Sequence, residues 1–519
     1  MVSLTRVARP VALALGVAIL AGAPRAASAQ GSAYVPLDDV SYAYIDALSA
    51  RGMLRSLSGL ERPYTRLELK AAIDSARLAP ASDVVASWLD RLSAATAKYD
   101  VAPDSDSTAA PMHARFSGDA FATAQSSSKR ELMLANDDNG VEPGATIKMV
   151  MAGGPLAISI RGLIDNRLNL DPEFAGRKDR SIAGRIEDGY GSGNWKYAEI
   201  SVGRVARNWG PPTLTGLQLG NYAYTYDHLY AKLGTPAIHI ATVLTRLDDY
   251  VLPDGTHSQR YFSIHRLALR HATWEIGAME SYLYTGPGRG FQPSLANPFN
   301  LYSLSWRNEG SQADGNLGMG VDGMWRSRRF GNIAVEIFLD DLQIDKCDTV
   351  CHEPSSYALT LSTEGFPIHG EQRGFASYTR VSNLAYRTPN PAERYESFGV
   401  GLGRGYSDYD ETRLGLDLAV LRAAPLRIYG AYRRQGEGDY RKPYPAIADY
   451  TTTPGFLSGV VMKVERAGIA TSAHAGAFEG SADVGINHTS NADHVPGRSS
   501  SGFEGRVKLS WTPSLHFDF

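Results

Sequence analysis

The final segment of the chain, residues 503–519, alternates between apolar and polar side chains and ends on an aromatic residue. Alternation with period two is typical of a β-strand with one apolar and one polar face. A soluble protein gains little stability from an apolar, aromatic last residue that has no cap. A transmembrane β-barrel must close its last strand against its first one, because lipid does not tolerate open sheet edges. The segment therefore favours a barrel over a soluble sandwich.

The same alternation is present in many parts of residues 112–519. Leu317 and Val321, for example, lie on the apolar face of one predicted strand. Short turns, such as residues 326–329, alternate with long polar loops, such as residues 285–316, as in outer-membrane barrels. We therefore expect a mainly β protein, a transmembrane antiparallel β-barrel whose polar face lines a watery lumen. Alternation by itself also fits a soluble sandwich.

The length of this region predicts about 16–18 strands of 10–11 residues each, with their turns and loops. Side chains alone do not fill so wide a barrel, so the lumen must be a channel or be plugged by loops or a domain. A terminal Phe resembles the signal recognised by the barrel-assembly machinery of bacterial outer membranes, which is a predicted partner together with outer-membrane lipid. The predicted barrel-closing C-terminal signal consists of Trp511, Leu515, Phe517 and Phe519.

Residues 1–29 have the features of a secretory signal peptide. Arg6 and Arg9 form a short basic region, an apolar run follows, and a small-x-small site ends at Ala29. The apolar run is too short for a stable transmembrane helix, although an anchor helix is the alternative. We expect export to the periplasm with cleavage near Ala29/Gln30, and a final location in the cell outer membrane.

A helical periplasmic or plug subdomain is predicted for residues 30–100, a linker for residues 101–111, and the barrel for residues 112–519. The helical region has apolar residues at helical spacing, and Thr65 and Glu68 form a predicted capping box. About 60 residues are too few for a robust core, so we expect this region to dock on the barrel. A plain helical subdomain without a plugging role is the alternative.

Two cysteines, Cys347 and Cys351, bracket three residues within a predicted surface loop. A disulfide is the expected state in an oxidising compartment. Two free thiols are the alternative. The spacing differs from the C-x-x-C-H pattern of haem attachment.

Composition and motifs exclude several function classes. The net charge of -3 provides no global basic field that would recruit nucleic acid. The sequence has no H-E-x-x-H, P-loop or dinucleotide-binding motif. We therefore expect no metal, no cofactor, no catalytic residues and no nucleic-acid partner. An outer-membrane hydrolase stays open as an alternative, because its catalytic residues could come from distant strands.

Several short motifs resemble the Wzi-like capsule-assembly family of bacterial outer-membrane proteins. They are residues 47–54 (ALSARGML), 62–69 (RPYTRLEL), 202–211 (VGRVARNWGP), 217–229 (LQLGNYAYTYDHL) and 399–410 (GVGLGRGYSDYD). The sequence departs from the family at Pro212, where Gly is more usual. The resemblance implies an 18-stranded barrel with an N-terminal helical bundle at its periplasmic end. It also implies a role in attaching or assembling surface polysaccharide without catalysis.

Arginine and aromatic residues near these motifs are candidates for binding an acidic glycan. Arginine can pair with uronate carboxylates, and aromatic rings can stack on sugar C–H surfaces. The predicted glycan-binding residues are Arg204, Arg207, Asn208, Trp209, Tyr440 and Arg441. The alternative for the first four of these is a lumen-facing strand end with an interfacial Trp. The alternative for the last two is a solvated surface loop or a loop folded into the lumen.

The leading hypothesis is an outer-membrane barrel that binds or helps assemble surface polysaccharide, without chemical turnover. A porin or transporter for small solutes, with the helical region as its plug, is the principal alternative.

Overall fold

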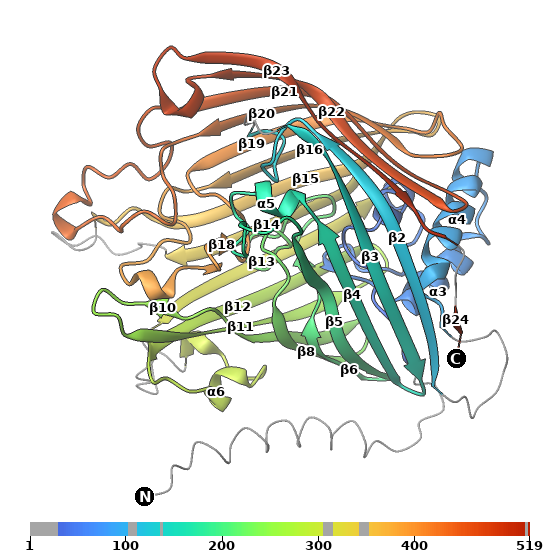
Figure 1. The fold of residues 1–519 in the computed structure, drawn as a ribbon, viewed down its shortest axis with the longest axis horizontal. Helices are drawn as coiled ribbons and strands as arrows, with labels where there is room; N and C mark the ends of the chain where they lie inside the picture. The colour runs from blue at the N-terminus through green and yellow to red at the C-terminus, as the bar shows by residue number, and fades with distance from the viewer. Residues whose placement is uncertain are drawn as a thin grey trace, which may run out of the picture.

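The computed structural model describes residues 30–101, 112–134, 139–304, 315–341, 352–513 and 517–518. Its main element is a closed barrel of 18 antiparallel strands (Figure 1), as the alternation and the resemblance predict. The predicted signal peptide and most of the predicted linker lie outside the described residues, so both stay predictions.

The barrel strands follow the order of the chain, and the last one, β23, closes the barrel by pairing with β2, where Leu509 lies opposite Ala122. The strands are β2 (His113–Gln125), β3 (Gly140–Gly153), β4 (Leu156–Asp165), β5 (Gly184–Trp195), β6 (Ala198–Arg204), β8 (Asp227–Gly234), β9 (Ile238–Arg246), β11 (His257–Arg270), β12 (Trp274–Pro287), β13 (Gly315–Ser327), β14 (Gly331–Asp341), β15 (Ser356–His369), β16 (Gln372–Val381), β19 (Tyr409–Leu418), β20 (Leu426–Gln435), β21 (Met462–Ala475), β22 (Phe478–Ser490) and β23 (Ser499–Trp511).

The remaining described strands have two residues each. They are β1 (Glu61–Arg62), β7 (Asn208–Trp209), β10 (Tyr250–Val251), β17 (Glu396–Ser397), β18 (Val400–Gly401) and β24 (Phe517–Asp518). The short helices outside the N-terminal region that lie wholly within the described residues are α5 (Arg167–Leu170), α6 (Pro293–Ala296), η4 (Pro391–Glu393), η5 (Ile447–Asp449) and η6 (Ala492–His494).

The outer face of the barrel is apolar. Ile276 and Ile486, for example, are exposed on it. Three tryptophans, Trp274, Trp325 and Trp511, also face outward, each near an end of a strand. An apolar band with aromatic residues at its border is the surface that a lipid bilayer requires of a β-barrel.

The two ends of the barrel differ in the length of their connections. At one end the strands are joined by short turns, from the β3–β4 turn to the β21–β22 turn. At the other end the connections are longer, and the one between β16 and β19 spans residues 382–408. The predicted asymmetry is therefore present, and it continues beyond residue 356, where the sequence pattern alone could not be followed.

The predicted C-terminal signal lies partly within the described residues. β24 pairs with β2, with Phe517 opposite Phe116, and Trp511 lies on the outer face. Leu515 and Phe519 lie outside the described residues. The role of these residues in barrel assembly stays a prediction.

Three helices form most of the N-terminal region: α2 (Ser41–Ser49), α3 (Arg66–Ala76) and α4 (Asp83–Thr96), followed by η2 (Ala97–Tyr99). The capping box at the start of α3 is present. The Thr65 hydroxyl accepts a hydrogen bond from the Glu68 amide at 3.2 Å, and the Glu68 carboxylate accepts one from the Thr65 amide at 2.9 Å. None of the helices in the described ranges is long and apolar enough to cross a membrane.

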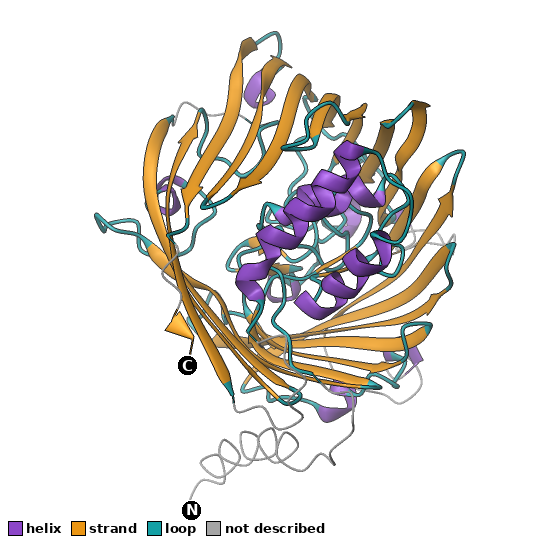
Figure 2. Cartoon of the chain, turned by 90° about the vertical axis from the view of Figure 1, so that its right-hand side faces the viewer, coloured by secondary structure: helices purple, strands orange, loops and turns teal. Residues whose placement is uncertain are grey.

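The helices lie across the end of the barrel that has the short turns (Figure 2). The indole of Trp88 donates to the carbonyl of Leu421 at 3.0 Å, and the hydroxyl of Tyr44 donates to the carbonyl of Ala423 at 2.7 Å. Both acceptors belong to the turn between β19 and β20. These contacts fix the helical region against the barrel rim.

A buried ion pair strengthens this attachment. The Lys98 ammonium lies 2.9 Å from Asp39 and 2.6 Å from Glu479 of β22. Burial opposes ionisation of the Asp39 carboxyl, but Lys98 and the Tyr99 hydroxyl hold its pKa well below the ordinary value. The contribution of Asp39 to stability is therefore complete above the ordinary carboxylate pKa, and it is lost only as the pH falls through the depressed value.

Candidate functional site

Three segments of the chain fill part of the barrel lumen. The first comes from the N-terminal region, residues 57–65, and the others are the connections at residues 205–226 and 382–408. β1 of the first segment pairs with β7 of the second, and Glu61 lies opposite Trp209. We call these three segments the plug.

The two connections of the plug bind each other through side chains and backbone. The hydroxyls of Tyr386 and Tyr395 donate to the carbonyls of Leu217 and Gln218, each at 2.7 Å. A Cβ atom at Gly403 would lie only 1.9 Å from the Leu217 carbonyl oxygen. Glycine is therefore required at this close approach, which lies within the GVGLGRGYSDYD motif.

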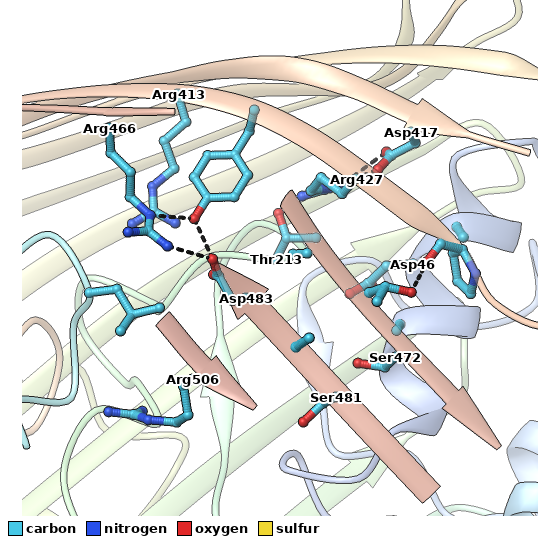
Figure 3. Close-up of a pocket in the computed structure, with 18 of the residues that line it drawn as sticks. Asp46, Thr213, Arg413, Asp417, Arg427, Arg466, Ser472, Ser481, Asp483 and Arg506 are labelled. Atoms are coloured by element: carbon cyan, nitrogen blue, oxygen red, sulfur yellow. Dashed lines mark hydrogen bonds and ion pairs between the residues drawn. The ribbon is translucent and has the colours of Figure 1, made fainter. Parts of the chain in front are cut away.

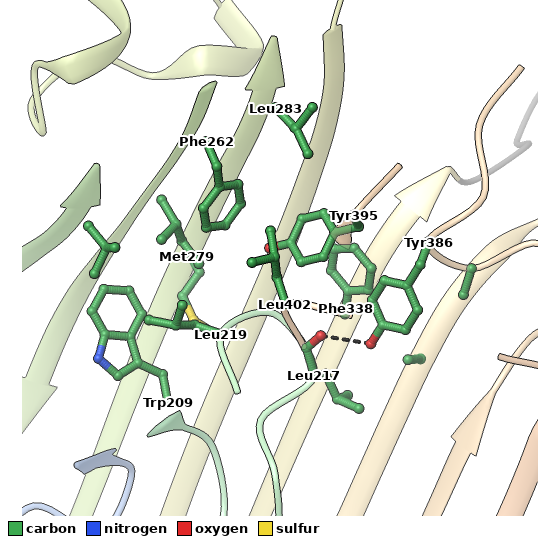
Figure 4. Packing of buried hydrophobic residues seen from close by; sticks show 14 of the residues in the cluster. Trp209, Leu217, Leu219, Phe262, Met279, Leu283, Phe338, Tyr386, Tyr395 and Leu402 are labelled. Atoms are coloured by element: carbon green, nitrogen blue, oxygen red, sulfur yellow. Dashed lines mark hydrogen bonds between the residues drawn. The ribbon is translucent and has the colours of Figure 1, made fainter. Parts of the chain in front are cut away.

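The plug forms a dry core with the barrel wall (Figure 4). Phe262 and Ile264 of β11 and Phe338 of β14 point inward and are fully buried against the plug. The expectation of a watery lumen is therefore wrong for this part of the barrel. The physical reason is that the loops return into the barrel and bring aromatic side chains, which exclude water from the wall that they cover. The plug residues of this core include Trp209, Leu217, Leu219, Tyr386, Tyr395 and Leu402.

A buried arginine connects the plug to three barrel strands. The Arg266 guanidinium of β11 donates two hydrogen bonds to Asp322 of β13, at 2.7 and 2.8 Å. It also pairs with Glu61 of the plug and with Glu275 of β12. The Glu61 carboxylate lies 2.9 Å from the ring of His239. Breaking this network would leave several buried carboxylates without a cation.

Two cavities of about 520 Å³ and 540 Å³ occupy another part of the lumen. They share five lining residues, so we treat them together as the basic cavity; Figure 3 shows the first of the two. The shared residues are Arg130, Glu131, Thr213, Arg413 and Arg506. The basic cavity reaches from Asp46 of α2, at the end with the short turns, to Tyr222 in the connection at the opposite end.

Small side chains on β21 and β22 help to create this space. Ala470 and Ser472 line the cavity from β21, and Ser481 lines it from β22. Ser472 lies opposite Ser481 in the register of the two strands. Because these side chains are short, they leave room in front of the wall.

The second of the two cavities is lined by eight basic and six acidic side chains. Each of the six carboxylates has a cationic partner within ion-pair distance. The pairs are Asp38–Arg161, Glu131–Arg433, Asp165–Arg167, Asp171–Arg130, Glu187–Arg185 and Glu411–Arg413. Three basic side chains, Arg404, Arg506 and Lys508, have no carboxylate partner in the part of the chain that the structure describes.

Two of these cations come from successive inward positions of β23. The Arg506 guanidinium donates to the carbonyl of Lys129 at 2.7 Å, and its Nε has no acceptor among the described residues. The Lys508 ammonium lies 4.3 Å from the ring centre of Phe121. A carboxylate or phosphate group entering the cavity would therefore meet two cations that have no carboxylate within ion-pair distance among the described residues, although Asp165 interacts with both at longer range.

Aromatic side chains border the cavity near the long connections. The Arg130 guanidinium lies 3.7 Å from the ring centre of Tyr224, and Tyr222 packs edge-to-face on Tyr406 at 5.9 Å. Burial raises the pKa of the Tyr222 hydroxyl well above its ordinary value, so this hydroxyl stays neutral. A second arginine, Arg185, lies 4.4 Å from the ring centre of Tyr224, and Tyr222 is buried, so side chains of the protein already occupy the faces of these rings.

Three of the predicted glycan-binding residues lie inside the plug. Arg207 donates to the ring nitrogen of His228 at 3.0 Å and to the Ser201 hydroxyl at 2.7 Å. The amide of Asn208 bonds to the backbone of the turn that follows it. Trp209 is buried in the dry core, and Arg207 and Trp209 also border a separate cavity of about 350 Å³.

The other three predicted residues lie elsewhere. Arg204 ends β6 and pairs with Asp227 at 3.0 Å, and Tyr440 is buried in the dry core. Arg441 is partly exposed and lies 3.6 Å from Glu173. Burial raises the pKa of the Glu173 carboxyl although Arg130 and Arg441 oppose this. The role of all six residues in glycan binding stays a prediction.

Cys347 and Cys351 lie outside the described residues, so the disulfide also stays a prediction. Within the described ranges, no group of three or more His, Cys, Asp or Glu side chains is arranged to hold a metal ion.

Sequence reasoning did not single out the basic cavity. Arg506 and Lys508 were visible only as two members of the polar face of the last strand. A useful signal would have been two cations at successive positions of one strand face, Arg506 and Lys508. Their neighbour Arg404 comes from a distant connection, which spacing along the chain cannot reveal.

Comparison with known proteins supports the fold. No family model matches the sequence, and no curated protein matches it. Among solved structures, the fold is similar to that of Wzi from Escherichia coli, described as an outer-membrane protein involved in group 1 capsule assembly and a carbohydrate-binding β-barrel. The TM-score is 0.61 at 13% identity, over 93% of this chain and 100% of that one. The outer membrane protein OprD from Pseudomonas aeruginosa gives a TM-score of 0.43 at 8% identity, over 80% of this chain and 97% of that one. The chain has a Wzi-like fold, that of an outer-membrane β-barrel.

Proposed function

We propose that this protein is an outer-membrane barrel that binds an acidic surface polysaccharide and anchors it or helps to assemble it, without chemical turnover. The observation that carries the proposal is the basic cavity, where three cations lack carboxylate partners beside aromatic rings, within a barrel that is otherwise plugged. The description of Wzi as a carbohydrate-binding barrel supports the same function.

The chemistry of the cavity fits a uronate better than a neutral sugar. The Nε atoms of Arg404 and Arg506 have no hydrogen-bond acceptor among the described residues and can donate to a carboxylate, and Lys508 adds a point charge. Tyr222 and Tyr224 border the cavity but already pack against arginines of the protein, so we assign the binding to the cations. Arg204 and Arg441 would contact further sugars near the long connections, whereas Arg207, Asn208 and Trp209 would hold the plug in place.

The proposed location follows from the fold and from the N-terminal sequence. An export signal in residues 1–29 would deliver the chain to the periplasm, and the barrel-assembly machinery would insert it through a C-terminal signal. The long connections would then face the cell exterior and the helices the periplasm.

Calorimetric titration of the purified protein with a uronic acid oligosaccharide, oligogalacturonate, tests this function. We expect it to bind at least about tenfold more tightly than its carboxyl-reduced form, because one charge-assisted hydrogen bond contributes about 1.5–3 kcal/mol. Affinity should fall as salt is added. Equal affinity for both forms, or no binding of either, would contradict the proposal.

A porin or transporter for small solutes is the second candidate. The observation that favours it is the basic cavity itself, which is lined largely by polar side chains and extends from α2 to the region of the long connections. The plug opposes it, because it occupies part of the cross-section through which solutes would pass. Measuring the conductance of the protein separates the two candidates.

A further inference from the structure

The outer wall of the barrel is covered by a loop on one side. On β12, Ile276 faces outward and is exposed, but Glu280 and Tyr282, which share its face, are largely buried. The same holds for His265 on the outward face of β11. The covering segment is residues 288–304, which follow β12 and include α6. We call it the outer flap.

The outer flap satisfies a carboxylate that points away from the lumen. The Glu280 carboxylate accepts hydrogen bonds from the Tyr302 amide at 2.8 Å and from the Ser303 hydroxyl at 2.6 Å. The ring of His265 lies 3.5 Å from the same carboxylate and 4.5 Å, between centroids, from the ring of Tyr302. A charged group on a lipid-facing wall is costly unless it is covered and paired. The flap covers Glu280 and donates two hydrogen bonds to it, and His265 of the wall lies beside it.

The outer flap also has an apolar core of its own. Leu295 and Tyr302 pack on Tyr282 and Tyr284 of the wall. The Tyr302 hydroxyl donates to the Leu295 carbonyl at 2.9 Å. The flap is therefore a packed part of the structure that has a defined inner and outer side.

The outer side of the flap is unusually apolar. Four large side chains on it are exposed: Phe291 at 55%, Phe299 at 71%, Leu301 at 51% and Leu304 at 53%. Loops that face water seldom present four such side chains within fourteen positions, because their exposure to water is unfavourable. The flap needs an apolar environment on this side.

We infer that the outer flap lies in the outer leaflet of the membrane and that its exposed side chains contact lipid acyl chains. Continuity supports lipid as the occupant. The flap lies on the same wall, and over the same outward row of side chains, as the exposed Ile276 of the apolar band. The flap thus places apolar side chains against lipid and covers a part of the wall where Glu280 and His265 would otherwise contact the membrane.

Fluorescence quenching by brominated lipid tests this inference. The probe is tryptophan at position 299, introduced by Phe299→Trp, with the protein in phosphatidylcholine vesicles whose acyl chains carry bromine. The matched control is Asp254→Trp, in the exposed loop before β11. We expect the Phe299→Trp difference spectrum to be blue-shifted and strongly quenched by bromine, and that of Asp254→Trp to be quenched by aqueous iodide instead.

Two results would overturn the inference. One is quenching of Phe299→Trp by iodide and not by brominated lipid, which would place the flap in water. The other is protection from both quenchers together with a dimer in solution, which would place a second copy of the chain on the flap. Leu301→Trp repeats the measurement if Phe299→Trp fails to give the heat-modifiable band of a folded barrel.

Discussion

Replacing Arg266 with methionine is expected to destabilise the barrel by about 3–5 kcal/mol, the usual cost of removing one partner from a buried ion pair. Arg266 is fully buried, and three carboxylates depend on its charge: Glu61, Glu275 and Asp322. Glu61 belongs to the plug, so the substitution should also loosen the plug. The measurement is the midpoint of heat-modifiable gel mobility, together with limited proteolysis of the plug.

Two further variants control this prediction. Arg246→Met removes an exposed arginine that pairs with Asp249, and should change the midpoint little. Adding Glu275→Gln and Asp322→Asn to Arg266→Met should restore part of the lost stability, because fewer buried charges then lack a partner. If Arg266→Met behaves like Arg246→Met, the network does not hold the plug as described.

The double variant Arg506→Gln, Lys508→Gln is expected to weaken binding of oligogalacturonate by at least about tenfold. Each side chain can form one charge-assisted hydrogen bond, which contributes about 1.5–3 kcal/mol, and about 1.4 kcal/mol corresponds to a tenfold change in the dissociation constant. Neither residue has a carboxylate partner among the described residues, so the variant should leave no acidic group unpaired. Calorimetric titration measures the loss.

The control for this variant is Arg498→Gln, which removes an exposed arginine just before β23. It should bind the oligosaccharide like the unaltered protein. Both variants should keep the heat-modifiable band of the folded barrel. Unchanged affinity in a folded double variant would show that the glycan does not bind in the basic cavity. Binding at another place on the protein would then need a separate test.

The architecture could be predicted because lipid imposes a simple pattern on the sequence. Each strand must place apolar side chains outward at every second position, as Phe503, Val507 and Leu509 do in β23. Local signals were equally reliable: Thr65 and Glu68 form the predicted capping box, since only four residues are involved.

The plug and the basic cavity could not be predicted because they depend on contacts between distant segments. Leu217 meets Tyr386 only after two connections have folded back into the barrel. Phe262 and Ile264 look like part of an ordinary strand, and nothing nearby indicates that they face a dry core. Trp209 is a predicted glycan-binding residue, yet it lies buried within that core. The local sequence does not indicate which loops enter the lumen, so this burial could not be predicted.

The central claim is that the plug obstructs the lumen, so that the space left beside it is a binding cavity and not a wide channel. Single-channel recording of the purified protein in a planar lipid bilayer tests it most directly. We predict no steady open state of the size expected for an unobstructed 18-stranded barrel. A stable, ohmic conductance of that size in the unaltered protein would contradict the claim and favour the porin.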